Sequence, residues 1–286
     1  MARAVALQIV TMSDTEHDYL LGTHDAELVR LGFQHRVWAG PTADAWERGG
    51  FRPGATILDV GCGPGYATLD LAQLVGRSGR VIAVDRSERF IGHLEAERRH
   101  LGLTQIETRL EDLESLSQAE ASVDYAFARW VLCFVPRPDE LVARVARSLR
   151  PGGTFVVMDY CNYEGFCVAP RSEVIERGIA AVAESFRRAG GNADVGRDLP
   201  EYMLRAGLEV QSIRPVVRLA RPRSLVWEWP WVFFVNFLPT LVEAGLMTEN
   251  DRLEFNRDWE ARSRDPGAYL LTPPMVEIVG VKPGRG

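Results

Sequence analysis

The sequence predicts an α/β fold in which a doubly wound, mostly parallel sheet is covered by helices on both faces. Apolar, strand-like runs alternate with helix-like stretches through the middle of the chain, in the order TILDVG, RVIAVD, QIETRL, DYAFAR and TFVVMDY. Such alternation is typical of βαβ units, because parallel strands need a crossover helix between them. A second observation is the glycine-rich turn within LDVGCGPGYATLDLA, residues 58–72, which joins the first of these strands to a helix.

The chain is expected to open with a helical segment over about residues 16–50. Thr23 is expected as an N-cap, and the spacing after it predicts one helical face that carries Leu28, Leu31, His35 and Trp38. Further helices are expected to start near Tyr66, Glu88, Pro138 and Arg171. The LRPGG turn at residues 149–153 ends a helix and directs the chain into the next strand.

The pattern changes after about residue 205. LEVQSIRPVVRLA is typical of a strand, about 50 residues of helical, Trp-rich sequence follow, and MVEIVGVKP closes the chain as another strand. The expected organisation is an N-terminal helical cap segment (1–50), a cofactor-binding core (51–220, of which 161–198 belongs partly to the cap), a helical lid insertion (221–275) and a final core strand (276–286).

Composition limits the classes of function. The chain has 286 residues with 46% hydrophobic content, enough to bury a large core, and its net charge of −6 opposes a nucleic-acid partner. The four cysteines form no CxxC pair, so we expect no metal site and a cytoplasmic location. No signal peptide is expected, and the most apolar run, WVFFVNFLP, is about half the length that a membrane span needs.

The glycine turn predicts a ligand of nucleotide type. Gly61, Gly63 and Gly65 follow a buried strand with GxGxG spacing, so bare backbone can approach a ligand beside a helix N-terminus. A tight strand-to-helix turn without a ligand is the alternative for an isolated glycine trio.

Three carboxylates favour the ligand. Asp59 lies two residues before Gly61, where its charge would repel a pyrophosphate but attract an ammonium group. Asp85 ends the next strand, where it can accept the hydroxyl protons of a ribose; its alternative role is the N-cap of the following helix, for which Ser87 competes. Asp112 follows the third strand, where it can accept from an adenine amine while the backbone N–H of Leu113 meets the ring.

With these residues the sequence resembles the class I S-adenosylmethionine-dependent methyltransferases. LDVGCGPG, VIAVDRS, EDLESL, VDYAFAR and LRPGG occur in that family's order over about residues 54–160. The resemblance implies a Rossmann-like, seven-stranded sheet of order 3-2-1-4-5-7-6 with a reversed last strand. It departs from the family's pattern at Glu111, where glycine is common before the adenine-binding acid, so Glu111 is the alternative to Asp112.

The same resemblance assigns the cofactor site. Asp59 and the glycine turn would hold the methionine part of S-adenosylmethionine, and Asp85 with its neighbour Arg86 would hold the ribose. Asp112 and Leu113 would hold the adenine. The remaining cofactor contacts would be Arg129 and Trp130 beside the sulfonium, and Tyr19, which would close over the cofactor.

Other classes of protein share parts of this pattern. A nicotinamide dinucleotide would need GxGxxG, and Tyr66 stands where its third glycine would be. A protein that binds the cofactor without catalysis, and a methyltransferase that acts on protein or RNA, are the alternatives left open. The absence of a basic, aromatic patch counts against RNA.

The acceptor side is expected to be apolar. Within RPRSLVWEWPWVFFVNFLP, we expect Trp227, Trp229, Trp231 and Phe234 to line a pocket for an aromatic or lipophilic acceptor, although each could simply pack the lid. His35, Asp159 and Tyr160 are the candidate catalytic residues, since a base would help if a hydroxyl or ammonium is methylated. Cys161 and Cys167 raise the weaker hypothesis of a thiol-bound acceptor such as arsenite.

The sequence thus predicts a bacterial, cytoplasmic small-molecule methyltransferase that acts as a monomer or homodimer. Transfer from the sulfonium to an O, N or C atom would be an in-line displacement, which requires no metal. Neither a nucleic acid nor a membrane is an expected partner.

Overall fold

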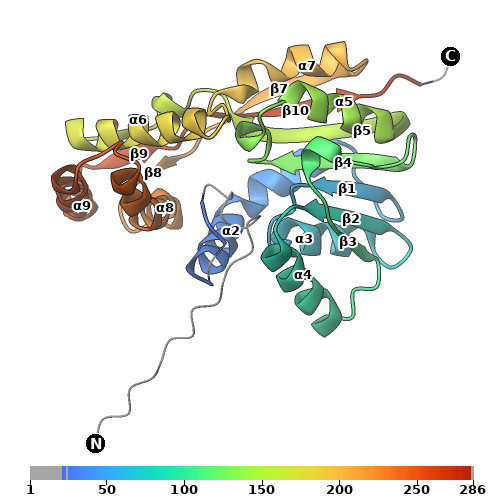
Figure 1. Ribbon diagram of the computed structural model, residues 1–286, viewed down its shortest axis with the longest axis horizontal. Helices are drawn as coiled ribbons and strands as arrows, with labels where there is room; N and C mark the ends of the chain where they lie inside the picture. Colours follow the sequence, from blue (N-terminus) through green and yellow to red (C-terminus); the bar gives the residue numbers. More distant parts are fainter. Residues whose placement is uncertain (1–20, 24, 285–286) are drawn as a thin grey trace, which may run out of the picture.

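A computed structural model describes residues 21–23 and 25–284 of the chain. Within these residues the main sheet has seven strands in the order β3-β2-β1-β4-β5-β10-β7 (Figure 1). The strands are β1 (Thr56–Val60), β2 (Arg80–Asp85), β3 (Ile106–Leu110), β4 (Val123–Arg129), β5 (Leu149–Tyr160), β7 (Glu209–Val216) and β10 (Met275–Val281). β10 runs antiparallel to both of its neighbours, β5 and β7. Counted along the chain, the order is 3-2-1-4-5-7-6 with a reversed last strand, so this prediction is confirmed.

Helices cover both faces of this sheet. Consecutive residues of a strand point to opposite faces. Ile57 of β1 accordingly joins a core with α2 (Asp25–Arg48), α3 (Tyr66–Val75) and α4 (Glu88–His100), whereas Leu58 joins a core with α5 (Pro138–Ser148) and α7 (Leu199–Arg205). The helix starts expected near Tyr66, Glu88 and Pro138 are confirmed. The three parallel strands β1, β4 and β5 therefore end at one edge between two packed layers.

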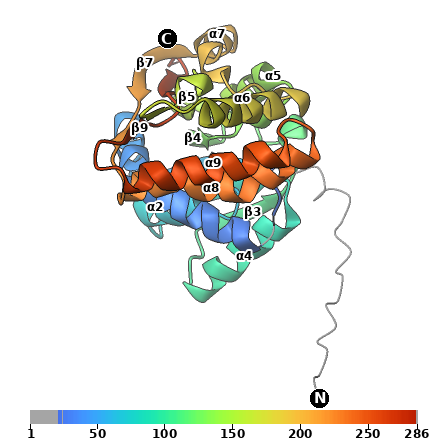
Figure 2. The ribbon, with the colours of Figure 1, turned by 90° about the vertical axis from the view of Figure 1, so that its left-hand side faces the viewer.

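A second structural unit packs against that edge. It contains α6 (Glu173–Arg188), α8 (Leu225–Glu243), α9 (Glu249–Arg264) and a small antiparallel sheet of order β6-β9-β8. The strands of this sheet are β6 (Cys167–Ala169), β8 (Leu219–Ala220) and β9 (Tyr269–Leu271). Figure 2 shows α8 and α9 side by side, with α2 next to α8. The stretch LEVQSIRPVVRLA, expected as one strand, is divided between β7 and β8, because β8 leaves the main sheet to pair with β9.

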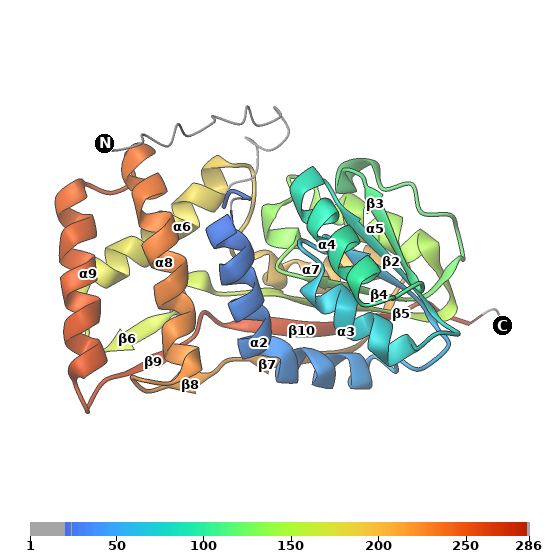
Figure 3. The ribbon, with the colours of Figure 1, turned by 90° about the horizontal axis from the view of Figure 1, so that it is seen from below.

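Helix α2 joins the two units. Figure 3 shows it between α8 on one side and α3 and α4 on the other. Its last turn is tied to the main sheet, since Arg48 Nε donates to Glu277 Oε1 at 2.7 Å and Arg48 Nη2 to Glu277 Oε2 at 2.5 Å. Glu277 is buried in β10. This helix consequently has a fixed position against both the sheet and α8.

The apolar part of helix α8 is longer than the sequence analysis predicted. Among the helices in the described ranges, α8 alone is long and apolar enough to span a membrane, although 44% of its apolar window is buried inside the protein. The expectation that no segment approached this length was wrong, because it counted only the run at residues 231–239. In the structure α8 packs against α2, α6 and α9.

Candidate active site

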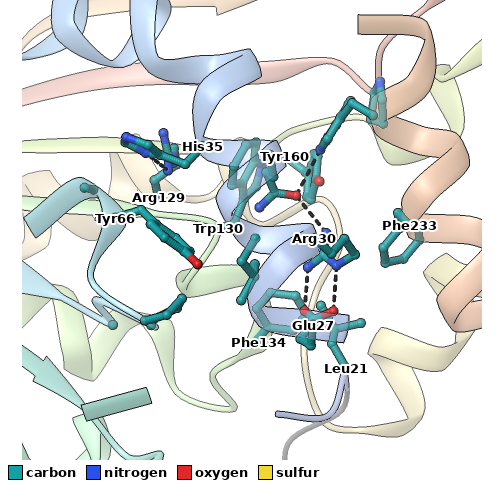
Figure 4. A pocket seen from close by; sticks show the side chains of 18 of the residues that line it. Leu21, Glu27, Arg30, His35, Tyr66, Arg129, Trp130, Phe134, Tyr160 and Phe233 are labelled. Carbon is teal, nitrogen blue, oxygen red and sulfur yellow. Dashed lines mark hydrogen bonds and ion pairs between the residues drawn. The ribbon is translucent and has the colours of Figure 1, made fainter. Parts of the chain in front are cut away.

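Two adjoining chambers lie at the carboxyl ends of the central strands. Here the chain leaves β1 toward one face of the sheet and leaves β4 toward the other face. The inner chamber, about 130 Å³, lies between the loop after β1, α2, the ends of β4 and β5, and α8 (Figure 4). The outer chamber, about 510 Å³, lies over the ends of β2 and β3 and the loop after β4. The two share Leu21, Gly61, Trp130, Phe134 and Phe186. Open α/β sheets bind ligands at this topological switch point.

The glycine turn faces the inner chamber with bare backbone. Gly65 has a φ of 87° and precedes α3, and a Cβ there would lie 2.4 Å from Leu94 Cδ1. Gly63 has a φ of 54°, but a Cβ there would meet no protein atom within 4 Å. Gly65 is therefore required by packing, whereas the space above Gly63 is left open toward the chamber. Gly61 lines both chambers and Gly65 lines neither.

Asp85 is held by the backbone at the rim of the outer chamber. Its Oδ2 accepts from Gly63 N at 2.7 Å and its Oδ1 accepts from Ser87 N at 2.9 Å. The alternative role of helix N-cap belongs to Ser87, whose Oγ accepts from Phe90 N at 3.2 Å. Burial raises the pKa of Asp85 above its ordinary value. The backbone N–H of Arg86 is a third donor to this carboxylate, which leaves one lone pair for a ligand hydroxyl, and Arg86 also lines the chamber.

Asp112 and Leu113 form the far wall of the outer chamber. Asp112 Oδ1 accepts from Glu114 N at 2.8 Å and caps the short 3₁₀ helix η1 (Leu113–Ser115). Its neighbour Glu111 lines neither chamber, because its Oε1 accepts from Ser117 N. Of the two acids that the sequence left open, Asp112 is thus the one at the chamber.

Asp59 and Arg129 place opposite charges at the floor of the inner chamber. Asp59 is buried beneath the glycine turn, and its Oδ2 accepts from Thr68 Oγ1 at 2.6 Å. Burial raises the pKa of Asp59 to about 6. Burial likewise lowers the pKa of Arg129 to about 10, against the attraction of Asp59. The Asp59 carboxylate can therefore meet a positively charged group of a ligand. The opposite charge of Arg129 keeps the net charge of this buried region small.

His35 links this floor to α3. Its Nδ1 lies 3.2 Å from Arg129 Nη2, and its Nε2 lies 2.9 Å from Asp70 Oδ2. Because a guanidinium only donates, Nδ1 accepts from Arg129 and Nε2 donates to Asp70, an assignment made from the hydrogen-bond network. His35 lines the chamber, but both of its ring nitrogens are engaged, so it holds Arg129 in place rather than presenting a free base.

Trp130 separates the two chambers in a strained backbone conformation. Its φ is 53°, in the left-handed region that bulky residues rarely adopt, at a cost of about 1–3 kcal/mol. The ring lies 4.9 Å from Arg129 Cζ and 6.0 Å from the ring of Trp229, and its Nε1 lies 2.9 Å from Met275 Sδ. These contacts hold the indole over the end of β4, where it lines both chambers.

Asp159 does not reach either chamber. Its Oδ2 accepts from Val131 N and Cys133 N, each at 3.2 Å, and its Oδ1 accepts from Tyr160 N at 2.9 Å. Burial raises the pKa of Asp159 to about 6. The structure therefore gives Asp159 the task of supporting the loop after β4, and its candidacy as a catalytic base is corrected. Adjacent residues of a strand face opposite sides, and Tyr160 is the one that lines the inner chamber.

The tryptophans of α8 point in two directions. Trp229 and Phe234 line the inner chamber. Trp227 and Trp231 do not: Trp227 Nε1 donates to Ser263 Oγ at 3.0 Å, and the Trp231 ring stacks 5.8 Å from that of Trp259. Residues two apart on a helix lie about 200° apart around its axis, so Trp229 faces away from both. The expectation that all four side chains line one pocket is corrected for Trp227 and Trp231.

A polar group on α2 also lines the inner chamber, and none of its residues was among those predicted for the site (Figure 4). Glu27 and Arg30 are 2% and 3% exposed and form a bidentate ion pair at 2.6–2.7 Å, and Arg30 Nη1 donates to Gln34 Oε1 at 3.0 Å. All three line the inner chamber. Positions 27, 30 and 34 share a helical face with Leu31 and Trp38, so polar residues on the predicted apolar face were the available signal.

Other candidates lie outside the chambers or outside the described residues. Tyr19 belongs to residues 1–20, which the structure does not describe. Of the cysteines, Cys62 lines the inner chamber, whereas Cys161 and Cys167 line neither chamber. Within the described ranges, no group of three His, Cys, Asp or Glu residues could hold a metal ion.

Known proteins share both the sequence pattern and the fold. A family model described as a methyltransferase domain matches residues 51–196, about half of the chain. The arsenite methyltransferase of Halobacterium salinarum is 28% identical over 184 residues, 56% of this chain and 47% of the relative. The demethylmenaquinone methyltransferase of Oceanobacillus iheyensis is 30% identical over 130 residues, 45% of this chain and 53% of the relative. The chain therefore spans about half the length of these curated relatives.

Among solved structures, geranyl diphosphate C-methyltransferase from Streptomyces coelicolor superposes with a TM-score of 0.58 at 16% identity. The match covers 87% of this chain and 77% of that one, which was solved with S-adenosylhomocysteine, Mg²⁺ and geranyl-S-thiolodiphosphate. The sheet order, the glycine turn and the family match lead to one conclusion. The chain belongs to the methyltransferase-domain family, and its main sheet has the strand order of the class I methyltransferase fold.

Proposed function

We propose that this methyltransferase modifies an O, N or C atom of a small aromatic or lipophilic acceptor bound in the inner chamber. The observation that carries the proposal is the lining of that chamber. Aromatic rings from β5, α6 and α8 surround it, among them Tyr160, Phe186, Trp229 and Phe234, directly beside the glycine turn. Pockets of this kind bind apolar ligands and use a few polar groups to orient them.

The cofactor is proposed to bind across both chambers. Asp59 and the open backbone at Gly63 would hold the methionine part, since no protein atom occupies the space above Gly63. Asp85 would accept from a ribose hydroxyl with Arg86 beside it, and Asp112 with Leu113 would hold the adenine. Arg129 and Trp130 would lie next to the sulfonium, and Tyr19 remains a proposed contact. The buried carboxylate of Asp59 fits an ammonium group, and the open cradle fits a ligand.

The chain's own residues would orient the acceptor and exclude water. S-adenosylmethionine, when bound, supplies an electrophilic methyl group on a sulfonium. Trp130 and Trp229 wall the chamber with rings that displace solvent, which favours an in-line approach of the acceptor. Burial raises the pKa of Tyr160 well above its ordinary value, so its hydroxyl stays protonated at neutral pH and can donate to the acceptor. Neither Asp159 nor His35 offers a free base to the chamber.

The domain division and location remain part of this proposal. Residues 1–50 and 221–275 would form the cap and lid, with help from 161–198, over a core of residues 51–220 and 276–286. α8 and α9 lie in the proposed lid, and α2 in the proposed cap. We place the protein in a bacterial cytoplasm as a monomer or homodimer, without a nucleic-acid or membrane partner.

Arsenite and macromolecular acceptors are less well supported. One relative is named an arsenite methyltransferase, but of the cysteines in the described residues only Cys62 lines the inner chamber. The net charge of −6 opposes RNA, and an aromatic chamber of about 130 Å³ suits a small molecule better than a protein chain.

The test is methyl transfer from labelled S-adenosylmethionine to a panel of naphthols, aminonaphthalenes, indoles and isoprenoid alcohols, followed by mass spectrometry. We expect one small apolar class to take up the label as a single methyl group that replaces a proton. Arsenite, total RNA and denatured cell protein serve as competing acceptors. Label that appears only in one of these three, with S-adenosylhomocysteine binding intact, would contradict the proposal.

A further inference from the structure

The polar group on α2 lies at the end of the inner chamber away from the glycine turn. We define it as the α2 triad: Glu27, Arg30 and Gln34. Arg30 Nε and Nη2 donate to Glu27 at 2.7 and 2.6 Å, and Arg30 Nη1 donates to Gln34 Oε1 at 3.0 Å. Trp229 Nε1 donates to the same Gln34 oxygen at 3.0 Å. Arg30 Cζ also lies 5.6 Å from the centre of the Phe233 ring, on α8.

These contacts leave several N–H donors of the triad available to the chamber. A guanidinium has five N–H groups, of which three are used, so two remain without a partner among the described residues. Gln34 Oε1 already accepts twice, which fixes the amide orientation and leaves the two N–H groups of Nε2 for the chamber. The carboxylate of Glu27 is engaged by Arg30 on both oxygens.

The charges of the triad cancel. Glu27 and Arg30 contribute one charge of each sign, and both are almost completely buried. An incoming carboxylate or phosphate would lose its hydration without meeting a net positive charge, so its desolvation would be poorly repaid. A neutral carbonyl oxygen, by contrast, can accept two N–H groups and carries no full charge that must be desolvated.

On this basis we propose that the α2 triad binds a neutral carbonyl oxygen of the acceptor. This inference rests on the proposed function, since it takes the inner chamber as the acceptor site. It narrows the substrate class to an aromatic or lipophilic ketone, quinone, amide or ester. The triad is an orienting site: it fixes one end of the molecule so that the other end faces the glycine turn.

The test uses three naphthalene probes of nearly equal shape. 2-Acetylnaphthalene carries the carbonyl, 2-isopropylnaphthalene replaces it by a hydrocarbon, and 2-naphthoate replaces it by a carboxylate. Each is titrated calorimetrically into the full chain saturated with S-adenosylhomocysteine. We expect the ketone to bind about tenfold more tightly than the hydrocarbon, as for one good hydrogen bond to a charged donor, and more tightly than the carboxylate.

The test variant removes both charges together, Glu27→Leu with Arg30→Met, because removing one would leave the other buried and unpaired. Replacing a buried ion pair with apolar side chains of similar volume is often neutral for stability. The matched control is Arg252→Met with Glu249→Leu, which removes a bidentate Arg–Glu pair with the same i,i+3 spacing on α9, outside both chambers. The ketone preference should fall below about twofold in the test variant and stay near tenfold in the control.

The binding results distinguish a failure of the triad assignment from a failure of the proposed acceptor chamber. An unchanged ketone preference in the test variant, or tighter binding of 2-naphthoate than of the ketone by the wild type, would overturn the assignment to the triad. Equal binding of ketone and hydrocarbon by the wild type would overturn it as well, while leaving the apolar chamber in place. Failure of every probe to bind the loaded protein would instead refute the proposed acceptor chamber, and the triad's role with it. A variant that no longer binds S-adenosylhomocysteine is replaced by Gln34→Met, for which the same reduction is expected.

Discussion

Asp59 is deeply buried, and the proposed cofactor site needs its carboxyl group to be ionised. Its pKa is raised from 3.8 to about 6 by burial. At pH 5 only about one-tenth of such a group is ionised, whereas above pH 7 nearly all of it is. If the carboxylate meets the ammonium of the cofactor, affinity for S-adenosylhomocysteine should rise about tenfold between pH 5 and pH 7.5.

Two variants test that pH dependence by calorimetry. Asp59→Asn should bind weakly with an almost flat profile. Asp159→Asn is the matched control, because burial raises the pKa of Asp159 to about 6 as well, yet Asp159 lines neither chamber. It should keep the wild-type slope, and a flat profile in this control would assign the pH dependence to the fold rather than to the site.

Asp85 is expected both to bind the ligand and to stabilise the backbone around it. Asp85→Asn should weaken binding of S-adenosylhomocysteine about tenfold, since one charged acceptor is lost, and should lower stability because Gly63 N and Ser87 N lose charged partners. Ser87→Ala should cost about 1 kcal/mol of unfolding free energy through the lost helix cap while leaving affinity unchanged. Thermal unfolding beside calorimetry separates the two effects, and equal affinity losses in both variants would remove Asp85 from the ligand site.

For single residues, the sequence indicated which side chains lie near the site but not the direction in which each of them points. The glycine turn, Asp59, Asp85 and Asp112 follow from spacing, because the turn starts directly after a strand and each acid lies within two residues of a strand end, all at the same edge of a parallel sheet. Asp159 and Tyr160 are neighbours on β5, and only the packed structure decides which of the two faces the chamber. The positive φ of Trp130 has no sequence signal at all, since tryptophan does not favour that conformation.

Helix α8 shows how periodicity assigns different tasks to similar residues. Trp229 Nε1 donates to Gln34 in the chamber, whereas Trp227 Nε1 donates to Ser263 on α9, each at 3.0 Å. Trp229→Phe and Trp227→Phe therefore remove one equivalent hydrogen bond each. We expect Trp229→Phe to weaken binding of 2-acetylnaphthalene about tenfold without changing affinity for S-adenosylhomocysteine, and Trp227→Phe to change only the unfolding free energy, by about 1–3 kcal/mol. Equal losses of probe binding would show that α8 acts only as a packing element.

Helices of ten residues or more were predictable, and strands of two or three residues were not. The helix that starts at Glu88 has a side-chain N-cap from Ser87, the one that starts at Pro138 has a first-turn proline, and the one that starts at Tyr66 directly follows the glycine turn. β6 and β9 have three residues each and β8 has two, too few for an alternation to be recognised. The buried Glu27–Arg30 pair broke the apolar pattern of α2, because its members satisfy each other and not water.

For the molecule as a whole, the order of the main sheet was predictable because it came with a known family, whereas the placement of the cap was not. α2 packs on both α8 and α3, and the Arg48–Glu277 pair fixes it to β10. The site is therefore assembled from residues far apart in the sequence, held between a sheet edge and a helical unit. The central claim is that the open space above Gly63, at the floor of this assembly, holds the cofactor.

The most direct test is calorimetric titration of S-adenosylhomocysteine into the wild type, Gly63→Ala and Gly102→Ala. Both glycines have a positive φ, 54° and 64°, and at both a Cβ would meet no protein atom within 4 Å. Alanine should therefore strain the two sites alike, by about 1–2 kcal/mol. We predict micromolar binding by the wild type and by Gly102→Ala, and at least about a tenfold loss for Gly63→Ala, because its methyl group occupies the proposed ligand space. Wild-type affinity in Gly63→Ala would contradict the account.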